Sequence, residues 1–368
     1  MRESNHESRI TNHALAARCG GRIAAACLAL LLSGCANIGY YWQSVSGQLG
    51  IWRRERPIEE VIKDVGTPDE LRRKLAAVVR IREFASRELN LPDNRSYRDY
   101  ADLGRPYAVW NVFAAPEFSV QAERWCFLFA GCVSYRGYFS REEADGFSAD
   151  LAGQGYDVHV GGVPAYSTLG WFADPVLSTF IHFPEADVAR LVFHELAHQV
   201  VYVKDDSAFN ESFAATVEQE GLRRWFGRSG DAKGMENYQR GRRMRMEFSR
   251  LVEKHRARLD ALYRSRLAPE AMRVRKRELL DELEADYRAL KAGWGGYSGY
   301  DGWFARPPNN ALLASFSLYA QRVPAFDALL QREGGDLARF YRAARELAAL
   351  PKEKRDRELA ALSSVNDK

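Results

Sequence analysis

Cysteine is scarce in this chain, and no charge sign dominates. Only five of the 368 residues are cysteines, which excludes a small scaffold held together by disulfides. Lys and Arg number 53 against 49 Asp and Glu, so no nucleic-acid partner is expected. The apolar run at residues 23–32 is too short to span a bilayer. No internal repeat is visible. With 46% hydrophobic residues, the chain can build one large domain or two closely joined ones.

The most informative segment is His194-Glu195-Leu196-Ala197-His198, inside an apolar-rich run from residue 188 to 202. On a helix, histidines at positions i and i+4 lie on one face about a turn apart, where both imidazoles can bind one metal ion. The residues around them, from 191 to 203, carry no charge besides Glu195. A lysine or arginine there would repel a metal. The pattern therefore predicts a buried metal-binding helix.

A carboxylate that could complete such a site follows shortly after. Catalytic zinc takes three protein ligands and keeps a fourth position for water. Glu211 stands at the start of a second helix-like run, with Ser207 and Asn210 as candidate caps. We expect the turn-forming residues between the two helices to bring the second one back to the histidines. The sequence thus predicts one Zn²⁺ ion bound by His194, His198 and Glu211.

Four further side chains are candidates for roles around the metal. Glu195 is too close in sequence to both histidines to bind the same ion well, so it is the expected general base, and the predicted reaction is hydrolysis of an amide bond. Glu218, two turns beyond Glu211, could orient a histidine ring, although a surface glutamate is the alternative. Tyr166 and Tyr319 are candidate contacts for the substrate or for an oxyanion, the alternative being buried structural tyrosines.

The N-terminal residues predict a secretion signal. The apolar run at residues 23–32 ends in Ser33-Gly34-Cys35, which resembles a bacterial lipobox, in which the chain is cut before the cysteine and lipid is attached to it. An ordinary signal with an incidental cysteine is the alternative. Ala36 replaces the aspartate that typically retains lipoproteins in the inner membrane. The expected location is therefore the cell envelope, lipid-anchored at the outer membrane and facing the periplasm.

Cys126 and Cys132 are the two cysteines outside the signal region. A pair in an oxidising compartment predicts a disulfide, here closing a tight hairpin or a bulged strand in an aromatic, β-prone segment. Two buried free thiols are the alternative.

The spacing of apolar residues and the positions of capping residues predict a few elements outside the motif region. Apolar residues recur at helical spacing from Leu71 to Leu91. Ser140 to Glu143 reads as a capping box that opens a helix, with a strand following at residues 156–160. Residues 244–290 predict two long antiparallel helices. The Gly- and aromatic-rich stretch at residues 293–303 is interpreted as a flexible lid.

The motif helix resembles the zinc-binding helix of zincin metallopeptidases, and a glutamate third ligand in an Asn-Glu context resembles the gluzincin branch. Together with Thr168–Ser178, Phe209–Ala214, Asn309–Leu313 and Val323–Phe326, it is similar to a family of bacterial lipoproteins known as predicted aminopeptidases. Two departures limit the resemblance. The spacing between His198 and Glu211 is shorter than in gluzincin aminopeptidases, and Ala215 stands where many of them have an aspartate.

The resemblance implies an α+β, predominantly helical fold with a zincin-like core, a small β-sheet and a long helical hairpin insertion. Four regions are expected: a signal peptide with lipobox over residues 1–35, N-terminal helices with the sheet and the zinc-binding core over 36–240, the helical hairpin over 241–292, and a loop with C-terminal helices completing the catalytic domain over 293–368.

The expected function is a zinc-dependent peptidase acting on peptides or proteins, and the family resemblance implies an aminopeptidase. Two alternatives stay open at this point. One is an envelope quality-control endopeptidase, because no acidic group is identified that would bind a free amino terminus. The other is a non-enzymatic lipoprotein with a structural zinc site that binds an envelope partner. Against that alternative, a purely structural site needs no carboxylate at the position of Glu195.

Overall fold

The structure, a computed structural model, describes residues 39–127, 131–165, 168, 172–316 and 322–363. The chain divides into two compact units, residues 1–53 and 54–368. In the first unit, residues 39–52 form a helix. Among the described residues, no helix combines the length and the apolar character needed to cross a membrane.

The larger unit is predominantly helical with small sheets, in agreement with the predicted class. Its elements, in chain order, are β1 (Glu55–Pro57), α2 (Ile58–Lys63), α3 (Asp69–Leu89), β2 (Asp99–Ala101), β3 (Val109–Pro116), β4 (Trp125–Phe127), β5 (Gly131–Val133), β6 (Arg136–Tyr138), α4 (Arg141–Gly153), β7 (Tyr156–Val163), β8 (Val176–Leu177), α5 (Glu185–His198), α6 (Ser207–Ser229), α7 (Ala232–Tyr263), α8 (Pro269–Gly293), the short 3₁₀ helix η1 (Asp301–Phe304), α9 (Asn310–Phe316), α10 (Val323–Arg332), α11 (Leu337–Ala348) and α12 (Lys352–Ser363).

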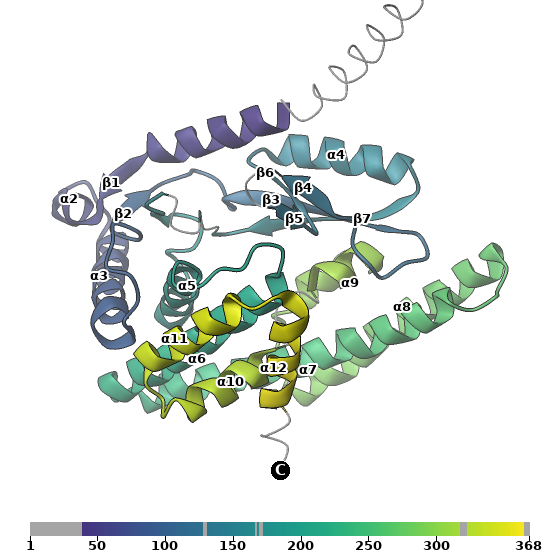
Figure 1. The fold of residues 1–368 in the computed structure, drawn as a ribbon. Helices are drawn as coiled ribbons and strands as arrows, with labels where there is room; N and C mark the ends of the chain where they lie inside the picture. Colours follow the sequence, from purple (N-terminus) through teal and green to yellow (C-terminus); the bar gives the residue numbers. More distant parts are fainter. Residues whose placement is uncertain (1–38, 128–130, 166–167, 169–171, 317–321, 364–368) are drawn as a thin grey trace, which may run out of the picture. The chain divides into compact units, whose positions relative to one another are not determined.

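The strands form three small sheets. In the first, β3 lies between β6 and β7, and it pairs antiparallel with β7 from Val109↔Val163 to Pro116↔Tyr156. In the second, β2 lies between β1 and β8. The third is the β4–β5 hairpin, in which Cys126 faces Cys132. Helices α4 and α9 both pack on β3 and β7, on opposite sides of the strands (Figure 1), which explains why β3 is buried over nearly its whole length.

Local signals account for several element boundaries. The Ser140 hydroxyl accepts a hydrogen bond from the Glu143 N–H at 3.2 Å, so α4 begins at the predicted cap. Helix α3 ends at Asn90, whose φ of 52° is the left-handed conformation that asparagine tolerates. Strand β7 extends to Val163, beyond the predicted end at residue 160.

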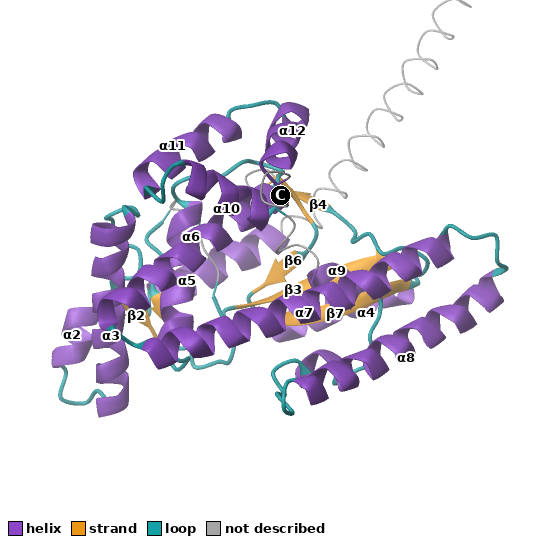
Figure 2. Ribbon diagram, turned by 90° about the horizontal axis from the view of Figure 1, so that it is seen from below, coloured by secondary structure: helices purple, strands orange, loops and turns teal. Residues whose placement is uncertain are grey.

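Helices α7 and α8 lie side by side (Figure 2). Their seam is built from residues that the heptad-like spacing selects: Leu251, Leu259, Leu262, Leu279, Leu283 and Tyr287 are buried. Helix α7 begins at Ala232, well before the predicted start, because Asp231 caps it by accepting from the Gly234 N–H at 2.8 Å. The stretch interpreted as a lid packs instead on this seam, where the Tyr300 ring stacks on Phe248 with centroids 4.0 Å apart.

A buried polar network ties α8 to the main sheet and to α9. The Lys276 ammonium donates to Asp157 Oδ2 at 2.6 Å and to the Glu117 carbonyl at 2.9 Å. The Asn310 N–H donates to the same Asp157 oxygen at 2.9 Å, and the Asn310 amide donates to the carbonyls of Pro116 and Glu117. Lys276 and Asn310 are 8% and 0% exposed. Every charge here has a partner, which is the condition under which buried polar groups stabilise a fold.

Replacing Lys276 by methionine should therefore destabilise the protein. The substitution keeps the apolar stem but leaves the partly buried Asp157 carboxylate without its cation, and we expect the free energy of unfolding in urea to fall by about 2–4 kcal/mol. The matched control is Arg277→Met on the same helix, at an exposed position, which should change it by less than about 0.5 kcal/mol. Equal effects in the two variants would contradict the network's role.

Candidate metal centre

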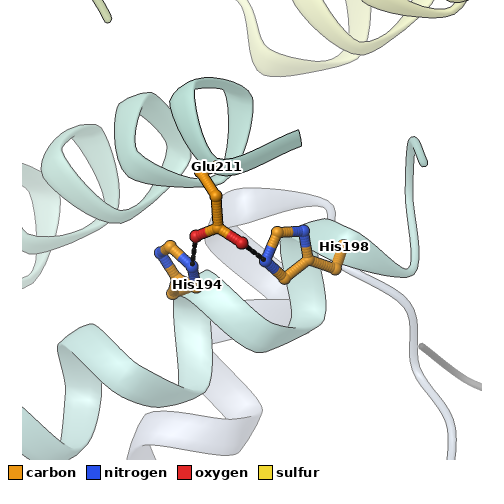
Figure 3. A group of neighbouring side chains, drawn as sticks. All are labelled: His194, His198 and Glu211. Atoms are coloured by element: carbon orange, nitrogen blue, oxygen red, sulfur yellow. Dashed lines mark ion pairs between the residues drawn. The ribbon is translucent and has the colours of Figure 1, made fainter. Parts of the chain in front are cut away.

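Helices α5 and α6 bring three potential metal ligands together. His194 and His198 lie a turn apart at the end of α5, and Glu211 lies in the first turns of α6. One donor atom from each lies within 4.8 Å of the other two. His194 Nε2 is 3.3 Å from Glu211 Oε2, and His198 Nε2 is 3.7 Å from Glu211 Oε1. Figure 3 shows the carboxylate of Glu211 pointing at both imidazoles.

The turn between the two helices is held by hydrogen bonds that fix the start of α6. The cap is Asp206, which accepts from the Phe209 N–H at 3.2 Å, so the expectation of a cap at Ser207 or Asn210 is wrong. Ser207 is the first residue of the helix. The Asn210 side chain instead closes the turn, accepting from the Val203 N–H and donating to the Val203 carbonyl, both at 2.8 Å. Glu211 follows directly and is aimed by this arrangement.

Asp206 is itself fixed from the far end of the chain. The Arg355 guanidinium donates to Asp206 Oδ2 through Nη2 at 2.8 Å and through Nε at 3.1 Å, and both side chains are almost fully buried. This bidentate contact links α12 to the cap of the helix that carries Glu211.

The donor set fits a tetrahedral metal such as zinc. Zinc bonds of about 2.1 Å place neighbouring tetrahedral ligands about 3.4 Å apart, close to the observed separations of 3.3 and 3.7 Å between the imidazole nitrogens and the carboxylate oxygens. The Glu211 Oε2 atom is buried and lacks a hydrogen bond of good geometry to any described residue. The separations between the three donor groups therefore fit the binding of one common ion better than direct hydrogen bonds between the side chains.

Glu218 contacts the outer nitrogen of the first histidine. Its Oε2 is 3.1 Å from His194 Nδ1 and 3.5 Å from Arg190 Nη1, and its side chain is 7% exposed. It is therefore not a surface residue. A carboxylate on this nitrogen fixes the ring so that Nε2 faces Glu211, which is the usual arrangement behind a metal-binding histidine. By contrast, His198 Nδ1 is buried without a hydrogen-bond partner among the described residues.

The charges of the cluster depend on one another. Burial lowers the pKa of His194, but the carboxylates of Glu211 and Glu218 raise it more, to about 10. Burial and the neighbouring His194 charge lower the pKa of His198 to about 4. Burial favours protonation of Glu211 and Glu218, yet their contacts with His194 hold both pKa values below the usual range. The cluster thus attracts a positive charge to the space between the imidazoles and Glu211.

Glu195 lies on α5 directly after the first histidine and forms no hydrogen bond with the described residues, although its side chain is only partly exposed. Burial raises the pKa of this carboxyl to about 7, and the negative charges of Glu211 and Asp174 add to the effect of burial, against that of His194. A carboxyl with such a pKa can both take and return a proton near neutrality.

Tyr97 is a residue of this region that the sequence does not reveal. Its hydroxyl is buried without a hydrogen-bond partner among the described residues. Its backbone has a φ of 63°, which is uncommon for a bulky residue and is held only where surrounding contacts impose it. Burial raises the pKa of the phenol well above its usual value, and the negative charge of Glu195 raises it further. The negative charge of Glu195, the predicted general base, therefore acts on the Tyr97 phenol.

The segment around Tyr97 is attached to the end of α5. Gln199, the residue after His198, accepts from Asn94 Nδ2 at 2.7 Å and donates to the Ser96 hydroxyl at 3.2 Å. The buried Arg82 side chain also donates to this segment, to the Ser96 carbonyl at 2.8 Å. The two contacts of Gln199 each span over 100 positions of sequence, so no local pattern could have placed Tyr97 here.

The other predicted residues have different outcomes. The Cys126–Cys132 disulfide is present, so that prediction is confirmed, and the Cys132 N–H donates to Asp205 in the α5–α6 turn at 2.8 Å. Cys35, Tyr166 and Tyr319 lie outside the described residues.

A cavity of about 1330 Å³ lies elsewhere, lined chiefly by parts of α3, α6, α7 and the segment after α8. None of the three donor residues lines it.

Comparison with known proteins places the chain in a family. The model of the family described as "Putative aminopeptidase" matches residues 39–359, and the chain belongs to this family. No curated protein matches the chain, and no solved structure does. The family description supports a peptidase. It names neither a metal nor a zincin-like core.

The three donors should bind one metal ion. We expect the purified protein to take up about one equivalent of Zn²⁺, measured by competition with a chromophoric chelator. His198→Ala removes one ligand and should weaken zinc binding by about 100-fold or more. The control His182→Ala changes an exposed histidine in the segment before α5 and should leave the affinity unchanged. Equal affinities of the two variants would remove His198 from the ligand set.

Proposed function

We propose that this chain is a zinc-dependent peptidase with a zincin-like core, acting as an aminopeptidase and anchored by lipid at Cys35 in the bacterial envelope. The observation that carries the proposal is the convergence of His194, His198 and Glu211, with Glu195 next to His194 on α5 and without a hydrogen bond to any described residue. Membership of the "Putative aminopeptidase" family supports the peptidase class.

The donor types favour zinc. Two imidazoles and one carboxylate suit a borderline metal that is stable without redox chemistry, and three protein ligands leave a position for water. When bound, zinc lowers the pKa of a water molecule toward neutrality and polarises a substrate carbonyl. Closing the site with a fourth protein ligand would be expected of a purely structural centre, and no fourth His, Cys, Asp or Glu joins the group among the described residues.

The chain's own residues then perform the proton transfers and the positioning. Glu195 accepts a proton from the attacking water and returns it to the leaving amine, which its lack of other partners permits. Glu218 keeps the His194 ring in its orientation through the 3.1 Å contact with Nδ1, while Arg190 compensates the buried Glu218 charge. The Tyr97 hydroxyl, which forms no hydrogen bond with a described residue, is available to donate one through a water molecule to the Glu195 carboxylate, whose charge acts on the phenol.

An envelope location agrees with the disulfide. A bond between Cys126 and Cys132 forms and persists in oxidising compartments such as the periplasm. Attachment at Cys35, with Ala36 after it, places the protein at the outer membrane on its periplasmic face.

Replacing Glu195 by glutamine tests the enzymatic role. The substitution removes the base but leaves the three ligands, so kcat/KM on a peptide library should fall by about 100- to 10,000-fold while zinc binding stays intact. The control Glu185→Gln lies on the first turn of the same helix and is partly exposed, and it should retain activity. If neither the wild type nor the control cleaves any peptide while zinc is bound, the chain is a binding protein and the proposal fails.

The choice between an aminopeptidase and an endopeptidase rests on the substrate's amino terminus. We expect the wild type to cleave peptides with a free amine and to lose about 100-fold or more in kcat/KM when the same peptides are N-acetylated, because an exopeptidase site recognises the charged amine. Mass spectrometry of the products gives the cleaved bond. Cleavage that is indifferent to acetylation identifies an endopeptidase.

Tyr97→Phe separates a catalytic contribution from a structural one. Because the buried hydroxyl has no partner among the described residues, its removal should leave the free energy of unfolding unchanged or slightly higher, while kcat falls by about 10- to 100-fold. The comparison variant is Tyr341→Phe, which loses a hydrogen bond to the Leu89 carbonyl and should lower stability by about 1 kcal/mol without changing kcat. Unchanged kcat in Tyr97→Phe would exclude the assigned role.

A further inference from the structure

The helix over residues 39–52 exposes its apolar side chains. Trp42 is 72% exposed, Val45 52% and Leu49 38%. These residues are spaced at i, i+3 and i+7, so they form one stripe along the helix. This pattern is the reverse of an ordinary surface helix, in which the exposed stripe is polar.

The composition of the helix is equally unusual for a surface in water. Residues 39–52 contain no Asp, Glu, Lys or Arg, whereas three arginines follow at positions 53, 54 and 56. The stripe is continuous, unlike a single exposed apolar residue, which needs no explanation. A stripe with a tryptophan, flanked by cationic residues, is typical of a helix that lies at the boundary between lipid headgroups and acyl chains.

We propose that residues 39–52 lie flat on a lipid bilayer, with Trp42, Val45 and Leu49 inserted below the headgroups and the exposed Arg53, the next residue of the same unit, facing anionic headgroups. The helix is too short and not apolar enough to span a membrane, so it lies in the plane of the interface. The first described residue of the helix, Gly39, lies four positions after Cys35 in the sequence, so lipid attached at Cys35 would hold the helix at a bilayer surface. The inference rests on the proposed lipid attachment at Cys35 only for bringing the helix to a membrane. The apolar face itself acts without the acyl chains.

The experiment uses the chain from residue 36, which contains every described residue and the whole family match but neither Cys35 nor the apolar run of the signal. Its two remaining cysteines form the disulfide. A single cysteine is introduced as Val45→Cys and labelled with a polarity-sensitive dye. The matched control is Val65→Cys, because Val65 is also an exposed valine, at 97%, outside the stripe.

Addition of phosphatidylcholine vesicles, with and without phosphatidylglycerol, should raise the fluorescence of the label at position 45 several-fold and leave position 65 unchanged. Binding should persist on the neutral vesicles, because the stripe is apolar. Trp42→Gln combined with Leu49→Gln should lower the vesicle partition coefficient about tenfold or more. Both residues are exposed, so the variants should fold, and unchanged zinc binding verifies this independently of peptidase activity.

Three results would overturn the inference. The label at position 45 could stay in a polar environment on both kinds of vesicle. Binding could survive the double variant and be abolished instead by Arg266→Ala and Arg277→Ala, on and near the turn between α7 and α8, which would make that hairpin the membrane contact. The double variant could also change the molecular mass of the protein in vesicle-free solution, which would identify the stripe as a contact between two copies of the chain.

Discussion

Two carboxylates in a nearly dry environment determine how α5 and α6 must pack. Glu211 and Glu218 project from the same helix toward His194, and a buried carboxylate without a cation would cost several kcal/mol. The imidazole and Arg190 supply part of the compensation, and a metal ion would supply the rest. The two helices are therefore coupled by charge as well as by apolar contact. The pKa of Glu195 depends on this coupling, because the charges of His194 and Glu211 act on its carboxyl.

The part of this centre that sequence predicts is the part that is local. His194 and His198 share a face because a helix repeats every 3.6 residues, and Glu211 lies at the start of the next helix. The sequence predicts a cap at Ser207 or Asn210, whereas the cap is Asp206, because all three residue types are good caps. The choice is decided by Arg355, 149 positions away. The sequence does not reveal Tyr97 for the same reason, since the position of its segment depends on contacts between α3, the following loop and Gln199.

The fold outside the centre follows the same division. The seam between α7 and α8 was predictable, because leucines repeat along each helix and bury one another. The attachment of that pair to the sheet was not, because it depends on Lys276 reaching Asp157 across 119 positions. The Asn309–Asn310 pair, which the family resemblance singled out, has a physical role here. Asn309 accepts from the Leu312 N–H and donates to the Val158 carbonyl, so the pair starts α9 and fixes it on β7.

Through the contact between Arg355 and Asp206, α12 supports the helix that carries Glu211 of the candidate metal centre. Asp206 begins the helix that carries Glu211, and its other oxygen is already engaged by the Phe209 N–H. A chain shortened before α12 would keep His194, His198 and Glu211 but would lose Arg355 and Lys352, two of the cationic side chains beside Asp206, and would retain Arg322 at 3.8 Å. The helix cap that precedes Glu211 is thus supported by a residue near the carboxyl-terminal end of the described chain, and this support can form only after residue 355 has been synthesised.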